Sequence, residues 1–160
     1  MARKTLSREE RAPDYKIRLV EEADSKNGLL ETLGSLSDLE GLPVEEARRA
    51  LKSMAHSSLY RTLVAVLADG QVIGSTTLLV EQKLIHKAGR VGHIEDVAVR
   101  KGFEDKGVGS SLVEAAVGMA SESGCYKVIL DCKEELVGFY EKLGFKRHEV
   151  AMRLDLRRKR

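Results

Sequence analysis

The sequence predicts an α/β sandwich, in which helices flank a mixed, mostly antiparallel central sheet. Apolar and polar residues alternate in several short segments, which indicates strands, while other segments carry apolar residues at helical spacing. The Asp69-Gly70 pair stands between apolar runs at residues 63–67 and 72–80, which is a strong signal for an antiparallel hairpin with a two-residue turn. A strand-helix-strand unit within residues 91–131 adds a parallel pair of strands.

The first part of the chain is predicted to form one strand and two helices. Residues 15–20 alternate between polar and apolar side chains and indicate the strand. A leucine-bearing helix is expected next, with Asp24 or Ser25 as its N-cap. A second helix is expected over residues 44–54, because Pro43 is well placed at its first turn.

The second part is predicted to form three strands and two helices after the hairpin. Strands are expected over residues 91–99 and 127–131, with a helix over residues 107–123 between them. A further helix ends at Gly144, and a last strand is expected over residues 146–156. This further helix is indicated by a stripe at positions i, i+3, i+4 and i+7, formed by Leu136, Phe139, Tyr140 and Leu143.

The composition indicates one domain with polar ends. The chain has 160 residues, 42% of them hydrophobic, which suits a single core. A single domain is expected over residues 15–156, between a mobile polar tail at residues 1–14 and a basic tail at residues 157–160. The net charge of +2 gives no global field that would favour nucleic acid or a membrane surface.

The expected setting of the protein is the cytoplasm. No apolar stretch approaches the roughly 18 residues that a membrane span needs, and residues 1–16 lack the hydrophobic centre of a secretory signal. Cys125 and Cys132 are too few for a disulfide framework, and no further cysteine or clustered histidine completes a zinc site. No metal is therefore expected.

A glycine loop, "KGVGS" at residues 106–110, follows an apolar strand and opens a helix. Helix N-termini carry unpaired N–H groups and partial positive charge, so they bind anions such as a pyrophosphate. Gly107 and Gly109 would let the anion approach the backbone, although Glu104 and Asp105 place negative charge beside it. An ordinary helix start, at which acidic residues complement the helix dipole, explains the loop equally well.

Two carboxylates lie in the apolar segment "GHIEDV" at residues 92–97. A strand that is buried on both faces rarely carries such a pair unless the carboxylates bind something or cap a turn. Glu95 and Asp96 therefore either contact a ligand or lie at a β-bulge or frayed end that presents them to water. The residues alone leave both interpretations open.

Tyr140 lies within the apolar stripe of its helix and also has two interpretations. A structural tyrosine with a satisfied hydroxyl is the simpler one. Alternatively, the phenol donates a hydrogen bond or a proton to a departing thiolate, because the pKa of a phenol is ordinarily higher than that of a thiol.

Four motifs together form a specific pattern. They are "EQKLIHKAGRVGHIEDVAV" at residues 81–99, "KGVGSSL" at 106–112, "GCYKVILDC" at 124–132 and "GFYEKLGF" at 138–145. In this order and at these spacings they strongly resemble the GCN5-related N-acetyltransferase (GNAT) superfamily, and within it the glucosamine-6-phosphate N-acetyltransferase family. A weaker "YKIRLVEEAD" segment extends the resemblance toward the N-terminus.

The resemblance implies the GNAT fold and acetyl-CoA as co-substrate. In this fold two neighbouring strands splay apart, here residues 96–99 and 127–131, and the pantetheine arm lies in the gap. The pyrophosphate would lie on the N–H groups of the glycine loop. The residues that the resemblance implies in cofactor binding are Asp96, Val97, Ala98, Val99, Asp105, Lys106, Gly107, Val108, Gly109, Ser110 and Tyr140.

The resemblance also implies glucosamine 6-phosphate as acceptor, in the biosynthesis of UDP-GlcNAc. A sugar phosphate needs cations, and Lys83, His86 and Lys127 are the candidates. The hydroxyls and the amine need acceptors, which Glu95, Asp96 and Asp131 can supply. The residues implied in sugar binding are Ser37, Lys83, Leu84, Ile85, His86, Glu95, Asp96, Val97, Tyr126, Lys127, Asp131 and Arg153.

The implied chemistry is direct attack of the neutral sugar amine on the thioester carbonyl in a ternary complex. The amine proton would leave through water to Glu95 or to the backbone carbonyl near Asp131, and the N–H around Val97 would stabilise the oxyanion. Tyr140 would serve the CoA thiolate, so the implied catalytic residues are Tyr140, Asp131 and Glu95. Members of the family are homodimers that share their sugar sites across the interface, so a homodimer with an exposed last strand is expected.

The chain departs from the pattern of the family at three positions. Glu104 stands where the family usually has arginine or glutamine, and Leu136 where it tends to have an amide. On the last strand the usual arginine is replaced by Asp155, and Arg153 is expected to take its place because it lies on the same face.

Two other functions are possible alternatives to acetyl transfer to glucosamine 6-phosphate. Acetyl transfer to a protein N-terminus, a polyamine or an aminoglycoside would favour an acidic pocket, whereas Lys83, His86 and Lys127 suit an anion. A non-catalytic acyl-CoA-binding module would agree with Glu104 and Leu136, but it would not need Tyr140 and Asp131.

Overall fold

The computed structural model describes residues 14–156. The chain divides into two compact units, Met1–Leu130 and Asp131–Arg160. The basic tail predicted over residues 157–160, and all but Asp14 of the tail predicted over residues 1–14, lie outside the described residues. In the described part of the chain, no helix is both long and apolar enough to cross a membrane.

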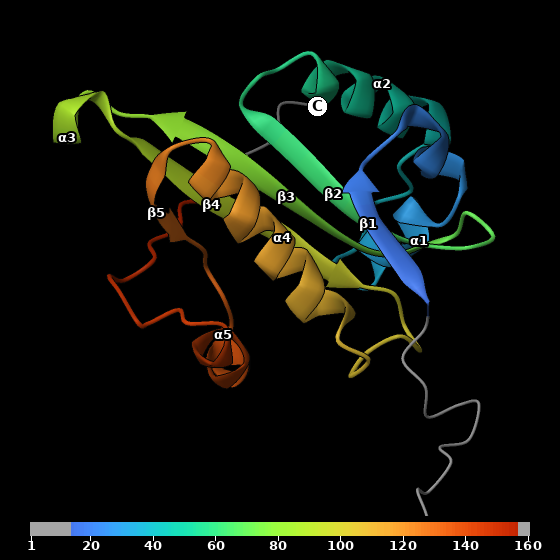
Figure 1. Ribbon diagram of the computed structural model, residues 1–160. Helices are drawn as coiled ribbons and strands as arrows, with labels where there is room; N and C mark the ends of the chain where they lie inside the picture. Colours follow the sequence, from blue (N-terminus) through green and yellow to red (C-terminus); the bar gives the residue numbers. More distant parts are fainter. Residues whose placement is uncertain (1–13, 157–160) are drawn as a thin grey trace, which may run out of the picture. The chain divides into compact units, whose positions relative to one another are not determined.

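The first unit is built on a five-stranded sheet in the order β1-β2-β3-β4-β5 (Figure 1). The first four strands pair antiparallel, and β5 pairs with β4 in parallel. The predicted mixed, mostly antiparallel sheet is therefore confirmed. Its strands are β1 (Tyr15–Leu19), β2 (Tyr60–Leu67), β3 (Val72–Gln82), β4 (Arg90–Val99) and β5 (Cys125–Ile129).

The turn between β2 and β3 is one residue longer than predicted. The Leu67 N–H donates to the Gln71 carbonyl, so three residues, not two, separate the paired positions. Gly70 alone among these three has a positive φ, of 88°. This is the arrangement of a three-residue hairpin loop, in which a glycine in the left-handed region follows a type I turn.

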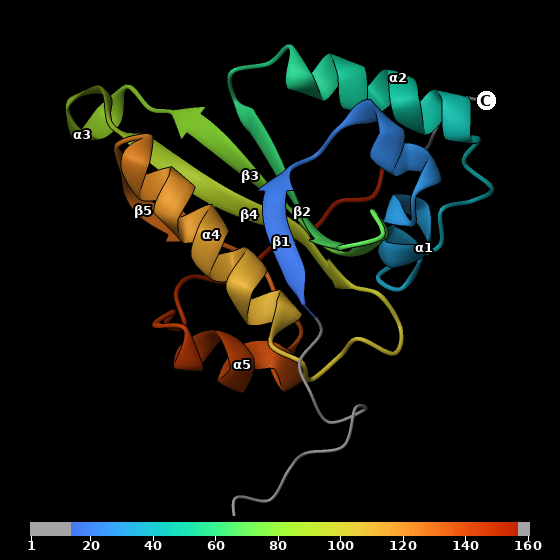
Figure 2. The ribbon, with the colours of Figure 1, turned by 45° about the vertical axis from the view of Figure 1, so that its right-hand side comes forward.

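The helices of the first unit cover both faces of the sheet (Figure 2). On one face, α1 (Leu29–Gly34) and α2 (Val44–Ala55) are close to the sheet, and Leu29 and Leu51 form a core cluster with Val64, Val66 and Val72. On the opposite face lies α4 (Val108–Glu122), which packs so closely that a Cβ at Gly74 would lie 2.7 Å from Val108 Cγ1. Burying each large apolar side chain in these layers contributes about 1.5–3 kcal/mol.

The N-cap expected for the leucine-bearing helix is wrong. Helix α1 begins after Gly28, which adopts the left-handed conformation with a φ of 94°. Asp24 instead lies in the preceding 3₁₀ helix, η1 (Glu22–Lys26), where its carboxylate is 1% exposed. It accepts two hydrogen bonds from the Arg18 guanidinium, at 2.7 and 2.8 Å, because a buried carboxylate needs a cation and donors. The helix over residues 44–54 is found as α2, with Pro43 as its N-cap.

The second unit contains a 3₁₀ turn, η2 (Glu134–Leu136), and helix α5 (Val137–Lys142). The strand predicted over residues 146–156 is wrong for this chain, because those residues form neither strand nor helix. Alternation alone does not build a strand, since its backbone groups need a paired neighbour. The alternating apolar residues of this segment are between 82% and 90% exposed, and they are Val150, Met152, Leu154 and Leu156.

Candidate active site

Strands β4 and β5 separate part-way along β4. Their parallel ladder runs from Arg90 opposite Cys125 to His93 opposite Ile129. Strand β4 continues to Val99 with β3 as its only paired strand among the described residues. The second half of β4 therefore offers a free backbone edge, which an extended ligand can pair with as an added strand would. The predicted splayed pair is confirmed, although β5 ends two residues before the predicted end at residue 131.

A β-bulge interrupts β4 within this free half. Thr76 of β3 faces two residues of β4, Asp96 and Val97. Asp96 has a φ of 50°, in the left-handed region that aspartate enters more readily than most residues. Glu95 and Asp96 are both exposed, as the bulge interpretation of the sequence predicts. Bulges commonly lie beside active sites, where they redirect side chains and end strand pairing.

The glycine loop leads from β4 into α4 and leaves the start of this helix open. Gly107 is the N-cap, with a φ of 80°, and as a glycine it has no side chain that could cap the helix. The first backbone hydrogen bond of the helix joins the Ser111 N–H to the Gly107 carbonyl at 3.0 Å. The preceding N–H groups, of Val108, Gly109 and Ser110, are therefore not used by the helix and are suited to bind an anion.

Glu104 turns toward its own loop rather than toward the helix start. Its carboxylate accepts the Gly102 N–H at 2.5 Å. Hydrogen bonds from its own backbone N–H and from that of Gly102 lower the pKa of this exposed carboxyl below its ordinary value. These N–H groups precede the ones at residues 105–110, so Glu104 does not occupy the proposed anion cradle.

A charged cluster lies at the opposite end of β3 and β4. Glu81 accepts a hydrogen bond from the Lys83 ammonium at 2.5 Å, and its other oxygen lies 2.9 Å from His93 Nε2. Both contacts lower the pKa of the Glu81 carboxyl, the Lys83 contact more strongly. The Lys83 ammonium, a predicted phosphate ligand, is therefore held by a carboxylate that the sequence did not single out.

The turn that joins β3 to β4 brings two more predicted sugar residues together. Its short helix α3 (Ile85–Ala88) contains three consecutive residues with positive φ, which are His86, Lys87 and Ala88. The His86 ring lies 4.7 Å from the ring of Tyr126, at the start of β5. The Gln82 amide donates to the Ala88 carbonyl at 2.6 Å and so holds the turn. Left-handed non-glycine residues are strained and concentrate at functional sites.

Strand register aligns the remaining polar residues of this region on one face of the sheet. Residues that pair directly on neighbouring strands have their side chains on the same face of the sheet. Glu95 pairs with Thr77, and Val91 pairs with Glu81 on one side and with Lys127 on the other. The predicted residues of the turn are largely exposed, with Leu84 at 95% and Ile85 at 64%. Among the described residues, the first unit thus places Lys83, His86, Tyr126 and Lys127 toward the Arg90–Cys125 end of the β4–β5 ladder. Glu95 shares a face with Glu81 and Lys127 but lies beyond the last pair of this ladder, His93 with Ile129.

The other predicted sugar residues are not brought to this cluster within the first unit. Ser37 follows α1 and is exposed. Asp131 and Arg153 belong to the second unit. The Arg153 guanidinium binds Asp155, at 2.6 Å from Nη2 and 2.7 Å from Nε, so these two neighbours satisfy each other there.

Tyr140 belongs to an aromatic group of the second unit. Its ring meets those of Phe139 and Phe145 edge to face, with centroids 4.9 and 5.9 Å away. Burial, and to a lesser degree the charge of Cys132, raise the pKa of the Tyr140 phenol above its ordinary value. Both the structural interpretation and the acid interpretation of Tyr140 agree with these contacts, and a raised pKa keeps the proton on the phenol.

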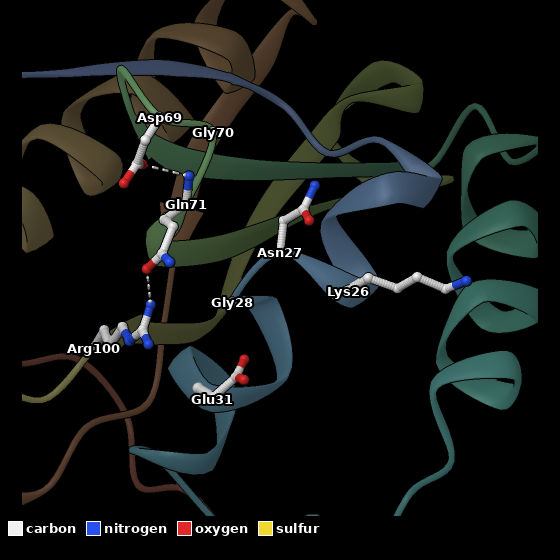
Figure 3. Close-up of a pocket in the computed structure, with 8 residues that line it drawn as sticks. All are labelled: Lys26, Asn27, Gly28, Glu31, Asp69, Gly70, Gln71 and Arg100. Carbon is white, nitrogen blue, oxygen red and sulfur yellow. Dashed lines mark hydrogen bonds between the residues drawn. The ribbon is translucent and has the colours of Figure 1, made fainter.

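A separate polar pocket of about 260 Å³ lies at the β2–β3 turn (Figure 3). Arg100, the residue after β4, donates to the Gln71 amide oxygen at 2.8 Å, and Asp69 accepts the Gln71 N–H at 3.0 Å. Asp69, Gln71 and Arg100 therefore satisfy one another within the pocket. The pocket is at the start of β3, roughly 30 Å along the strand from Glu81 at 3.3 Å per residue, so it is not part of the Lys83 cluster.

The chain was compared with known proteins. The profile of the acetyltransferase (GNAT) family matches residues 30–145. A Candida albicans protein named glucosamine 6-phosphate N-acetyltransferase is 41% identical over 139 residues, 86% of this chain and 93% of that protein. A Trypanosoma brucei brucei protein of the same name is 36% identical, over 89% of this chain and 97% of its own length. The chain belongs to the GNAT family, among the glucosamine 6-phosphate N-acetyltransferases.

Solved structures of this family have the same fold as this chain. The crystal structure of glucosamine-6-phosphate N-acetyltransferase from Arabidopsis thaliana has a TM-score of 0.85 and 32% sequence identity, and the match covers 90% of this chain and 99% of that one. An acetyltransferase structure from Trypanosoma brucei has a TM-score of 0.82 at 38% identity, over 89% of this chain and all of that one. The GNAT fold expected from the motifs is confirmed.

Two residues of the Lys83 cluster in this GNAT acetyltransferase, Glu81 and His93, carry no motif that would single them out in the sequence. The signal was present in the spacing: Leu79 pairs with His93, so Glu81 is the diagonal neighbour of His93 on the same face of the sheet. A charged residue that lies two positions from the partner of a histidine on the neighbouring strand of a hairpin can therefore contact that histidine. The pairing register was needed to see it, because a shift by one residue would put them on opposite faces.

Proposed function

We propose that this acetyltransferase transfers the acetyl group of acetyl-CoA to the amine of D-glucosamine 6-phosphate, giving N-acetyl-D-glucosamine 6-phosphate and CoA. The observation that carries the proposal is the order of features from the β3–β4 turn along β4: the Lys83–Glu81–His93 cluster, then Glu95, then the bulge and the glycine loop. A phosphate-binding end, a reacting centre and a pyrophosphate-binding end would follow one another in this order.

The cofactor would bind along the free half of β4. Its pantetheine arm would pair with the backbone at Asp96, Val97, Ala98 and Val99, and its pyrophosphate would accept N–H donors at residues 105–110. Two observations support this proposal, the end of the β5 ladder at His93 and the uncapped start of α4. Glu104 is exposed and is bonded within its own loop, so it does not block that start.

The acceptor would bind at the cationic end of β4. Lys83, His86 and Lys127 are suited to its phosphate, and Glu95 to its hydroxyls or amine. His93 and Val97 are four residues apart, which is about 13 Å along a strand. That distance accommodates a hexosamine phosphate between a lysine side chain and the bulge. An anionic acceptor also agrees with the three lysines at this end, Lys83, Lys87 and Lys127. Glu81 pairs only Lys83 of these, and the other two would repel a polyamine or an aminoglycoside.

The reaction would proceed by direct attack in a ternary complex. The neutral amine nitrogen forms a bond to the thioester carbon, and the oxyanion that results accepts the backbone N–H at the bulge. Collapse of this intermediate breaks the C–S bond, while the amine proton leaves through water to Glu95 or to the backbone near Asp131. Tyr140 would donate to the departing CoA sulfur, and its raised pKa supports a phenol that is protonated at neutral pH.

We further propose that the enzyme is a cytoplasmic homodimer whose product enters UDP-GlcNAc synthesis. The dimer is supported by the exposed alternating segment at residues 150–156, which lacks a partner strand among the described residues. Such a segment is suited to pair with a second copy of the chain, since an unpaired strand is a template for intermolecular pairing.

The test is a thiol-release assay with acetyl-CoA and a panel of amines. Glucosamine 6-phosphate should exceed unphosphorylated glucosamine in kcat/KM by a large factor, and both should exceed polyamines and aminoglycosides. Product analysis should find the acetyl group on the sugar nitrogen. Equal kcat/KM for the two sugars would refute the phosphate site, and release of thiol with none of these amines would refute the proposed acceptor.

A further inference from the structure

The β-bulge of β4 has a specific partner in the neighbouring strand. Thr76 of β3 is fully buried, and its hydroxyl donates to the carbonyl of Glu95 at 3.1 Å. Glu95 directly precedes the bulged residues Asp96 and Val97, and Thr76 is the single residue that faces both of them. Because a bulge disrupts the regular ladder, this side-chain hydrogen bond fixes the backbone just where the strand pattern fails.

The conformation that this bond fixes carries strain. Asp96 has a φ of 50°, and a non-glycine residue remains in the left-handed region only where its surroundings hold it. Leu78 and Gly74 flank Thr76 two positions away on β3 and are buried beneath α4, so the threonine side chain has no freedom to leave. The buried strand β3 thereby keeps the strained backbone of β4 in its bulged conformation.

We propose that Thr76 is a positioning residue of the transferase: its hydroxyl locks the β4 bulge, so that the backbone at Asp96 and Val97 faces the acetyl-CoA thioester. The inference rests on the proposed function for the reacting centre, but the lock itself concerns cofactor binding and does not depend on the acceptor. Thr76 itself touches neither substrate in this assignment, and it acts through the Glu95 carbonyl.

The experiment compares three variants. Thr76→Val keeps the shape of the side chain and removes the donor, Thr76→Ser keeps the donor and removes the methyl group, and Thr32→Val is the matched control. Thr32 is also fully buried, and its hydroxyl also donates to backbone carbonyls, that of Gly28 at 2.8 Å and that of Val72 in β3 at 3.1 Å. Each variant is examined by thermal unfolding, by calorimetry with CoA, by steady-state kinetics and by amide hydrogen exchange over residues 94–99.

Thr76→Val should lose about tenfold or more in kcat and bind CoA more weakly, while KM for the sugar phosphate changes little and exchange at residues 96–97 accelerates. Thr76→Ser should restore kcat to within about threefold, and Thr32→Val should lower stability without these effects. Equal losses in Thr76→Val and Thr32→Val, or unchanged exchange at the bulge, would overturn the proposal.

Two further arms keep the test decisive. If Thr76→Val does not fold, the serine variant alone decides, because loss of CoA binding with the hydroxyl retained contradicts the lock. If the wild-type enzyme does not acetylate glucosamine 6-phosphate, CoA calorimetry and hydrogen exchange still report on the bulge, so a wrong acceptor and a wrong lock give different results.

Discussion

At the scale of single residues, the substitution Tyr140→Phe tests whether the hydroxyl of this tyrosine is structural or catalytic. Tyr140→Phe keeps the edge-to-face contacts with Phe139 and Phe145 and removes only the hydroxyl. If the phenol serves the leaving thiolate, kcat should fall roughly ten- to a thousandfold, while both KM values change little, because this contact strengthens only as charge develops on sulfur. Steady-state kinetics with a thioester of lower thiol pKa checks the assignment, since that leaving group should recover part of the loss.

The pH dependence supplies a control for the same prediction. Burial and Cys132 raise the pKa of the phenol, so the protonated donor should persist at alkaline pH beyond the ordinary range of tyrosine. The wild-type kcat should therefore show no tyrosine-linked decline until the pH exceeds that range. A folded phenylalanine variant with unaltered kcat, under conditions where chemistry limits the rate, would leave Tyr140 a residue of the core.

Lys83 carries the second prediction at this scale. Lys83→Ala removes the ammonium that Glu81 holds at 2.5 Å and should raise KM for the sugar phosphate roughly ten- to hundredfold, as expected for the loss of a charge-assisted hydrogen bond. The KM for acetyl-CoA should stay nearly constant, because the glycine loop is at the other end of β4. Lys52→Ala on the exposed side of α2 makes the same change of net charge and should leave both KM values unaltered.

At the scale of elements, the glycine loop and α4 give the clearest test of the cofactor site. Gly109→Val places a branched side chain at the second residue of α4, where the pyrophosphate would approach the backbone, and should abolish CoA binding in calorimetry. The matched variant is Gly118→Val in the same helix, where a Cβ meets nothing within 4 Å, and it should bind CoA normally. Similar CoA affinity for both variants would contradict the proposed pyrophosphate site.

The elements also show what the sequence can and cannot predict. The five strands of the sheet and the apolar helix α4 were predicted to within a few residues, because local hydrophobic periodicity indicates them. The same alternation predicted a strand over residues 146–156, which have no paired neighbour among the described residues. The N-cap at Asp24 was mispredicted because its tertiary partner, Arg18, takes the carboxylate into a buried ion pair. The bulge at Asp96 was one of two open interpretations, since only the register against Thr76 reveals the extra residue.

The candidate site was predicted less completely than the fold, because some of its contacts depend on how the strands pair. Motifs identified Lys83, His86 and Lys127 as candidate cations, but the Glu81–His93 contact depends on the pairing of two strands. Thr76 gives no sequence signal at all, because a buried threonine in a strand is ordinary. Residues that position others are found through contacts and not through motifs.

At the scale of the whole molecule, the remaining question is what pairs with residues 146–156. Their alternating apolar side chains predict a strand, yet four of them are more than 80% exposed and no described strand pairs with them. Exposed alternation of this kind favours association. The proposed homodimer, in which each chain receives the last strand of the other, would explain both observations.

Leu154→Glu tests this assembly. The new charge would have to be buried in an interface between copies, so the variant should sediment as a monomer at concentrations where the wild-type protein is a dimer. Its CoA affinity should be retained, because the glycine loop and the free half of β4 belong to the first unit, while KM for the sugar phosphate should rise if Arg153 of this segment serves the site. Val117→Glu introduces the same charge at a partly exposed apolar residue of α4 and should leave the sedimentation coefficient unchanged. A wild-type protein that sediments as a fully active monomer at every concentration would exclude the exchange of the last strand.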